Sequence, residues 1–476
     1  MVIIMEDKKA AIRRGIDDWF AKYSNEMIDD LGRILAIKSV KSLPEEGAPY
    51  GAGSRSVLAL ASSMLEERDF TVDTFEDIMI SADIGPKPPK MGILAHLDVV
   101  DAGEGWDSEP YSMTIKDDRI YGRGALDNKG PSVAAMYALY CARELCPEFK
   151  HGFRLILGSG EETGCEDIAC YLEKNTPPQY VFTPDADYPL VNIEKGRAAV
   201  FFSESWEKDS STPRVISING GKTMNVVPNR AEAVIEGFSM KDLEMYCMVS
   251  SAQTGAKMSV HASEQGFIVE AVGKSTHAAT PELGINAQTA LLDMLSGMPL
   301  ADSKGRELIR ALNRLFPHGD NNGQALGIAM SDEKTGALTV NFGVLRFTET
   351  DFTANFDSRT PSCADEVDLP DMIRKAIGNE GIEVTNIIQS KCHHTPEESP
   401  FVQTLLRIYE DYTGNPGGCL SMGGQTYVHE IPGGVAFGCE LPGTDNQIHG
   451  ANEFIGVEQL IVSAKMFAQS IIDMCG

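Results

Sequence analysis

Between residues 91 and 185, short apolar runs alternate with stretches of helical periodicity. Met91–Ala95 and Phe153–Leu157 have strand length, and Pro131–Leu145 between them is apolar nearly all round. Near-continuous apolar strands suit a sheet that is buried on both faces, and an all-round apolar helix suits a core. This alternation predicts a parallel sheet with helices on both faces. We therefore expect an α/β fold with a doubly wound, mostly parallel sheet.

Acids and a histidine follow the apolar runs. His96 and Asp98 end the first run, and their i, i+2 spacing puts both side chains on one face of an extended segment. Glu161 and Glu162 lie in a glycine-flanked loop after the second run, and Asp185 follows a third. In open α/β sheets, sites form at the carboxyl ends of strands. We therefore expect these side chains to lie close together.

A glycine-rich turn holds one further acid. Tyr121–Pro131 reads Tyr-Gly-Arg-Gly-Ala-Leu-Asp-Asn-Lys-Gly-Pro and contains Asp127. Its glycines permit positive φ, and a proline suits the first turn of the helix that follows. The turn is therefore suited to hold one carboxylate in place, and our hypothesis is that Asp127 bridges two metal ions.

The candidate metal ligands combine two histidines with three carboxylates. They are His96, Asp127, Glu162, Asp185 and His449, the last in the loop before the C-terminal helix. This set suits zinc, and also manganese or cobalt. A bridging carboxylate would hold two ions roughly 3.5–4 Å apart, and such a pair would lower the pKa of a shared water to ~7.

Two neighbours of these ligands have other predicted roles. Glu161 is expected to act as a general base that takes a proton from the water and returns it to a leaving amine. Asp98 is expected to accept a hydrogen bond from the far ring nitrogen of His96 and so fix its orientation.

Each of these residues also has an ordinary explanation. A His-x-Asp at a strand end is weak evidence by itself, and a Glu-Glu pair is usually a solvated face. Asp187 is a local rival of Asp185, and His449 alone is compatible with an ordinary loop histidine. Their joint occurrence at successive strand ends is what favours a metal site.

Composition limits the class of partner. The chain has 476 residues, 42% hydrophobic and 23% charged, which is typical of a soluble protein with two or more domains. Its net charge of −28 disfavours nucleic acid and membrane surfaces. The N-terminus lacks the basic-then-apolar order of a signal peptide. The ten cysteines include no Cys-x-x-Cys pair, which fits reduced thiols, so we expect a cytoplasmic protein.

From about Gly196, strand-like stretches such as Ala231–Phe238 dominate. Thr353–Arg359 alternates with period two, so Asp357 and Arg359 share one face. The α/β pattern resumes near residue 392. We therefore predict a first domain formed by residues 1–195 and 392–476, with residues 196–391 inserted as a second, α+β domain.

Together these residues resemble a known family. The matching segments are His96–Asp98, Gly122–Pro131, Gly160–Gly164, Thr183–Asp185 and His449–Glu453, in the expected order along the chain. The chain resembles the di-metal peptidases and amidohydrolases that include carnosinases, aminoacylases, bacterial glutamate carboxypeptidases and succinyl-diaminopimelate desuccinylases. The sequence Leu-Asp-Asn-Lys-Gly-Pro at 126–131 is most similar to that of the PepV-type bacterial dipeptidases.

The resemblance implies an arrangement for the ligands. Asp127 would bridge, one metal would bind His96 and Asp185, and the other would bind Glu162 and His449. The resemblance also selects Asp185 over its rival and implies a cis peptide bond after Asp127. The first domain would then be a di-metal catalytic domain.

The resemblance implies that the inserted domain is a lid with substrate-binding residues. His277 would stabilise the developing oxyanion, Asn225 would contact substrate, and Arg359 would bind a C-terminal carboxylate. Gly424, in a glycine-rich loop, would also contact substrate. The ordinary alternative for each lid residue is a hydrogen bond inside the lid. Because the lid is large enough to replace the partner subunit of dimeric family members, we expect a monomer.

The glycine-rich loop departs from the branch it resembles. That branch typically reads Gly-Gly-Gly-Thr-Tyr-Ala-Arg, whereas Met422–His429 reads Met-Gly-Gly-Gln-Thr-Tyr-Val-His. A larger side chain at Gln425 would narrow the substrate pocket or change the end group that it accepts.

We therefore predict a dipeptidase with two divalent metal ions, zinc being favoured over manganese or cobalt, that hydrolyses unblocked dipeptides with Glu161 as base. The alternative on the same fold is an N-acyl amino-acid deacylase or desuccinylase, which needs no free substrate amine. A third hypothesis is a catalytically silent peptide-binding homologue. The intact base and ligand set count against it.

Overall fold

The computed structural model describes residues 2–476, with side chains from residue 9 onward. The chain divides into two compact units. The first contains the residues up to Ile193, His393–Leu420 and Gln425–Gly476, and the second contains Glu194–Cys392 and Ser421–Gly424. Ser421–Gly424 therefore groups with the second unit, although the sequence pattern predicts residues 392–476 to belong to the first domain.

A nine-stranded sheet forms the centre of the first unit, in the order β1-β2-β6-β3-β7-β22-β9-β20, with β21 paired to β9. Its neighbours β6, β3, β7 and β22 run parallel, whereas β1, β2 and β9 pair antiparallel toward the edges. The strands are β1 Val72–Phe75, β2 Met79–Ile84, β3 Pro89–His96, β6 Gly152–Gly158, β7 Tyr180–Thr183, β9 Leu190–Glu194, β20 His393–His394, β21 Cys419–Met422 and β22 Val435–Ala436. The predicted α/β fold class is confirmed.

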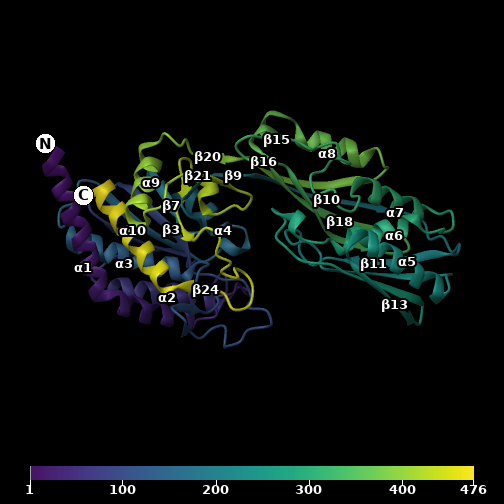
Figure 1. Cartoon of the computed structure of the whole chain (residues 1–476), viewed down its shortest axis with the longest axis horizontal. Coiled ribbons are helices and arrows are strands. Elements are labelled where there is room, and N and C mark those ends of the chain that lie inside the picture. Colours follow the sequence, from purple (N-terminus) through teal and green to yellow (C-terminus); the bar gives the residue numbers. More distant parts are fainter. Residues whose placement is uncertain (1) are drawn as a thin grey trace. The chain divides into compact units, whose positions relative to one another are not determined.

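Helices cover both faces of this sheet. Successive residues of a strand point to opposite faces, so they pack into two different hydrophobic cores. In β6, Leu155 and Leu157 join a core with α3 and α10, whereas Ile156 joins a second core with α4 and the 3-10 helix η4. The helices are α1 Val2–Leu35, α2 Ala52–Glu66, α3 Lys129–Leu145, α4 Glu166–Lys174, α9 Pro400–Thr413, α10 Val457–Cys475, η1 Glu161–Thr163 and η4 Tyr427–Glu430. The yellow α10 packs beside α3 (Figure 1).

Short strands form two smaller sheets in the first unit. The order β24-β5-β4 joins Phe454–Gly456, Arg119–Tyr121 and Thr114–Lys116, and β23 Cys439–Glu440 pairs with β8 Ala186–Asp187. None of the helices within residues 2–476 has the length and apolar content of a membrane span.

The second unit is an eight-stranded sheet in the order β13-β14-β12-β11-β17-β18-β10-β19, in which all these neighbours pair antiparallel. The strands are β10 Gly196–Ser205, β11 Arg214–Gly220, β12 Arg230–Glu236, β13 Lys257–Ser263, β14 Gly266–Val272, β17 Thr339–Phe347, β18 Asp351–Thr360 and β19 Glu383–Ser390. A small pair, β15 Ser331–Asp332 and β16 Gly336–Ala337, lies outside this sheet. The helices are α5 Met240–Thr254, α6 Ala287–Gly297, α7 Lys304–Leu315, α8 Leu369–Gly378, η2 Pro281–Leu283 and η3 Ser362–Glu366. Residues of α5–α8 share one hydrophobic core with the sheet.

Candidate metal centre

The fold brings the five predicted ligands to one place. His96 is the last residue of β3, Asp185 follows β7, and Glu162 lies in η1 just after β6. Since β6, β3 and β7 are parallel neighbours, these three residues share the carboxyl edge of the sheet. Asp127 instead follows β5 of the small sheet, and His449 lies in the loop before β24.

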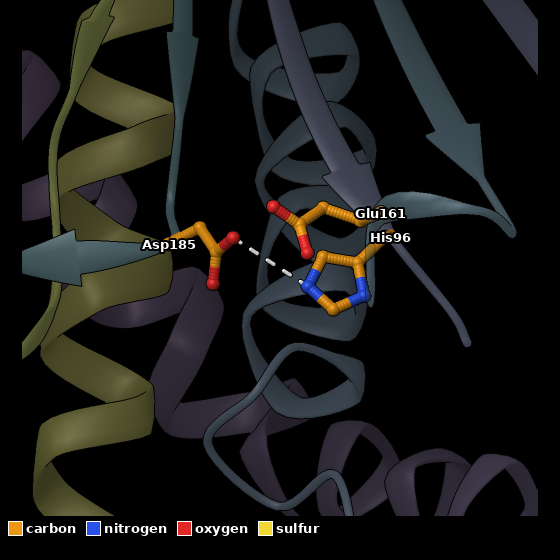
Figure 2. A group of neighbouring side chains, drawn as sticks. All are labelled: His96, Glu161 and Asp185. Atoms are coloured by element: carbon orange, nitrogen blue, oxygen red, sulfur yellow. Dashed lines mark ion pairs between the residues drawn. The ribbon is translucent and has the colours of Figure 1, made fainter. Parts of the chain in front are cut away.

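One group of ligand atoms comes from His96, Glu161 and Asp185, which offer atoms within 4.8 Å of one another. The two carboxylates point toward the imidazole ring, and His96 Nε2 lies 3.5 Å from Asp185 Oδ2 (Figure 2). Glu161, predicted to be a base, is therefore also close enough to contact an ion held here.

The second group comes from Asp127, Glu162 and His449. His449 Nε2 lies 2.8 Å from Asp127 Oδ2 and 3.2 Å from Glu162 Oε2. The other oxygen of Asp127, Oδ1, lies 3.1 Å from His96 Nε2. One carboxylate thus faces both groups, which is the geometry that a bridging ligand requires.

Two buried atoms in this cluster have no hydrogen-bond partner within the described residues, namely His96 Nε2 and Glu162 Oε1. A buried polar atom without a partner costs free energy, and both atoms are of the kind that binds zinc. Their unmet bonding capacity, together with the donor set, fits divalent cations.

Burial, with a smaller contribution from neighbouring carboxylates, raises the pKa of three acids in this cluster. Burial, with a contribution from Asp127, raises the pKa of Glu162 to about 7. Burial also raises the pKa of Glu161 and of Asp185, and neighbouring carboxylates add to both shifts. Burial acts in the same direction on Asp127, but the adjacent imidazole rings of His449 and His96 outweigh it and lower the pKa of this carboxyl. A bound cation would relieve this repulsion.

Asp98 joins the histidine to the loop of the two glutamates. Its carboxylate accepts hydrogen bonds from the backbone N–H of Glu161 at 3.3 Å and of Glu162 at 3.1 Å. His96 Nδ1 lies 3.4 Å from Asp98 Oδ1 and 3.1 Å from the Asp98 carbonyl oxygen. The Asp98 carboxylate lies near His96 Nδ1, and its orienting role stays a prediction, whereas its contacts with η1 were not predicted.

Sequence similarity to known proteins covers all the residues of the candidate metal centre. A sequence model of Peptidase family M20/M25/M40 matches residues 92–473. The chain belongs to this family. A relative named "Putative dipeptidase YtjP", from Bacillus subtilis, is 32% identical over 455 residues, which cover 94% of this chain and 97% of the relative. The family resemblance inferred from the motifs is thereby confirmed.

Solved structures of peptidases share the fold. Human carnosine dipeptidase 1 aligns with a TM-score of 0.56 at 14% identity and covers 98% of each chain. The M20 family metallo-carboxypeptidase Sso-CP2 from Sulfolobus solfataricus aligns with a TM-score of 0.58 at 17% identity, over 94% of this chain and 98% of its own.

Glu453 organises the turn that carries Asp127 in this family member, a contact that sequence reasoning missed. The buried carboxylate accepts hydrogen bonds from three backbone N–H groups and one side chain. The donors are Gly124 N at 3.0 Å, Leu126 N at 2.9 Å, Asp127 N at 3.1 Å and Arg123 Nη1 at 2.7 Å. The only sequence signal for Glu453 is its position at the end of the matching segment His449–Glu453.

Asp185 has a support of its own. Asn128 Nδ2 donates to Asp185 Oδ1 at 3.0 Å and to the Pro184 carbonyl at 2.8 Å. The peptide bond between Asp127 and Asn128 is cis, as the resemblance implies. Asp187 lies outside both ligand groups.

The substrate-binding candidates belong to the second unit. Val226 and His277 pair across an isolated bridge, and Ala278 N donates to the Asn225 carbonyl at 2.8 Å. Asn225 and His277 therefore lie on adjoining segments, and both residues are exposed.

Arg359 and the glycine-rich loop are directly connected. The buried Arg359 donates from Nε to Asp357 Oδ1 at 2.7 Å and from Nη1 to the Gly423 carbonyl, next to Gly424, at 2.8 Å. The contact between Asp357 and Arg359 agrees with the shared face that their spacing predicts. Gln425 Nε2 lies 3.2 Å from His429 Nε2, so two of the residues that depart from the PepV-type loop contact each other.

Proposed function

We propose that this chain is a metal-dependent dipeptidase that hydrolyses the peptide bond of unblocked dipeptides. The observation that carries the proposal is the pair of ligand groups that share Asp127, with Glu161 beside them. Membership of a peptidase family and a relative named as a dipeptidase support the same activity.

Two divalent ions would complete the cluster, zinc being favoured over manganese or cobalt. One would bind His96 and Asp185, the other Glu162 and His449, and Asp127 would bridge. The carboxylates of the two groups, with Glu161 included, number four. Two divalent ions would balance their charge. When bound, the ions would polarise a carbonyl and lower the pKa of a water.

The protein groups would then move the proton and hold the substrate. Glu161 would take the proton of the attacking water and pass it to the leaving amine. Asp98 would hold both the base loop and the imidazole of His96 in place through the contacts described above.

The second unit would supply the substrate contacts. In this proposal His277 stabilises the oxyanion, Asn225 and Gly424 contact the substrate backbone, and Arg359 binds the terminal carboxylate. The link from Arg359 to the loop of Gly424 supports a joint role for these two. The ten free cysteines favour a reducing, cytoplasmic location.

The test compares wild type with Glu161→Gln on a panel of dipeptides, with zinc or manganese supplied. Because a general base typically contributes about 10²- to 10⁴-fold, we expect kcat to fall by that range. Metal content, measured by mass spectrometry, should stay at two ions per chain. Glu166→Gln, an exposed acid at the start of α4, is the matched control and should retain full turnover.

The same panel separates the alternatives. Turnover confined to N-acylated substrates would move the chain to the deacylases. No turnover of blocked or unblocked substrates, with metal bound, would leave a peptide-binding homologue.

A further inference from the structure

Two arginines face each other across the sheet of the second unit. In the antiparallel pairing of β10 with β18, Arg197 lies directly opposite Arg359. Like charges in directly opposed positions destabilise an antiparallel pair. The arrangement therefore needs negative charge nearby.

One carboxylate meets both guanidinium groups. Asp357 is completely buried, and its Oδ2 accepts from Arg197 Nε while its Oδ1 accepts from Arg359 Nε, each at 2.7 Å. Within the described residues, no other carboxylate forms an ion pair with either arginine. The cluster thus holds two positive charges against one negative charge, and one positive charge is left over.

The free hydrogen-bonding capacity belongs to Arg197. Arg359 uses Nη1 on the Gly423 carbonyl, and its side chain is 5% exposed. The Arg197 side chain is 36% exposed, and its Nη2 lies 3.9 Å from the sulfur of Met224, a weak acceptor. In the part of the chain that the structure describes, no oxygen accepts from either terminal nitrogen of Arg197.

This excess charge lies beside the substrate-binding candidates. Met224 directly precedes Asn225, and Asn341 Nδ2 fixes the segment by donating to the Met224 carbonyl at 2.9 Å and the Val226 carbonyl at 3.1 Å. Arg197 therefore borders the same segment whose Val226 forms an isolated bridge with His277.

We propose that Arg197 is a specificity-determining residue that binds a carboxylate of the substrate, with Asp357 holding Arg197 and Arg359 as a paired receptor. The inference rests on the proposed dipeptidase function and adds a second arginine to it. A guanidinium presents a planar pair of donors that matches a carboxylate. The carboxylate comes either from the C-terminus of the dipeptide or from an acidic C-terminal side chain.

The experiment measures kcat/KM of wild type, Arg197→Gln and Arg197→Lys on Ala-Ala, Ala-Ala amide, Ala-Asp and Ala-Asn. In Arg197→Gln we expect a loss of about 10- to 150-fold, mostly in KM, for the substrate with the recognised carboxylate, the range of one charge-assisted hydrogen bond. The neutral counterpart should be unaffected, and Arg197→Lys should recover part of the loss.

The substrate pairs distinguish the two sources of the carboxylate. If Arg197→Gln lowers the ratio of kcat/KM for Ala-Ala to kcat/KM for Ala-Ala amide, Arg197 binds the C-terminal carboxylate. If it lowers the ratio of kcat/KM for Ala-Asp to kcat/KM for Ala-Asn, Arg197 binds the acidic side chain. Arg214→Gln is the matched control, because Arg214 in β11 also pairs with acids, Glu236 and Glu349, and should leave both ratios unchanged.

Unchanged ratios in both Arg197 variants would overturn the inference while leaving the dipeptidase function intact. A wild type that makes no distinction within either pair would overturn it as well. If wild type hydrolyses none of the four, the function itself fails. The inference is then decided by calorimetry of the same four compounds with the zinc-loaded wild type and Arg197→Gln, where equal affinities would overturn it.

Discussion

At the scale of single residues, the placement of Asp127 depends on Glu453. Glu453→Gln replaces one of two acceptor oxygens by an NH₂ group that would face N–H donors, and it leaves buried Arg123 without a counter-charge. Breaking a buried ion pair costs about 3–5 kcal/mol, so we expect the free energy of unfolding to fall by that order. Losing such a support typically lowers metal affinity about 10- to 100-fold. Urea unfolding and chelator competition measure the two effects.

Glu458→Gln is the matched control for this change, because Glu458 is exposed in the first turn of α10. It should alter neither quantity. Metal affinity equal to that of wild type in folded Glu453→Gln would contradict a role of Glu453 in positioning Asp127.

Sequence reasoning named the candidate ligands and a support for His96, but it missed the residue that holds the turn of Asp127. His96, Glu162 and Asp185 each follow an apolar strand, and that is a local pattern. The role of Glu453 arises from donors more than 300 residues earlier in the chain, at positions 123–127. No local spacing encodes such a contact.

At the scale of elements, β2 and β6 are joined by a partly buried ion pair. Asp83 lies opposite Arg154, and the two make bidentate contacts of 2.7 and 2.8 Å. Burial alone would raise the pKa of Asp83, but Arg154 outweighs it and lowers this pKa. We therefore expect Asp83→Asn to reduce the free energy of unfolding at pH 7 by about 1–3 kcal/mol.

The sign of the pH dependence follows from the lowered pKa. Such a carboxyl stabilises the fold above its unfolded pKa, near 3.9, and loses this contribution as pH falls through the lower folded value. The difference between wild type and Asp83→Asn, measured by urea unfolding from pH 7 downward, should therefore shrink below about pH 4. Asp73→Asn on β1, an exposed site, is the control. A difference that stays constant down to pH 3 would show that the ion pair is not its cause.

The ion pair between Asp83 and Arg154 also explains why strand β2 is hard to predict from the sequence. β2 reads Met-Ile-Ser-Ala-Asp-Ile, and its buried Ser81 and intermediate Asp83 interrupt the apolar run, so no strand was predicted at Met79–Ile84. Near-continuous apolar runs such as β3 and β6 were recognised, because their burial on both faces needs no polar partner. Helical spacing of the apolar residues near the N-terminus predicts a helix over residues 7–40, but α1 ends at Leu35, before the turn that leads to Ser39. Ser39 is buried and donates its hydroxyl to the Leu97 carbonyl, a distant contact that sequence periodicity does not contain.

At the scale of the whole molecule, the chain is organised as two units with separate cores. The boundary near Gly196 can be predicted from the sequence, because the strands on its two sides have different hydrophobic patterns. A parallel sheet covered on both faces has continuous apolar strands, whereas an antiparallel sheet covered on one face has alternating ones. The membership of Ser421–Gly424 in the second unit is not visible, because it rests on backbone contacts such as Lys195 N to the Met422 carbonyl. The monomeric state stays a prediction.

This organisation has a consequence for metal removal. Both ligand groups belong to the first unit, so an ion bound there stabilises that unit directly. At a free metal concentration 1,000-fold above Kd, linkage contributes about 4 kcal/mol, which corresponds to a Tm change on the order of 10 °C for a unit of this size. Calorimetry with metal and with chelator should therefore show two transitions, of which one moves down by this order. The other transition is the internal control and should stay in place. Equal shifts of both, or one transition that moves as a whole, would contradict independent units, because metal bound at one core cannot stabilise a second core that unfolds separately.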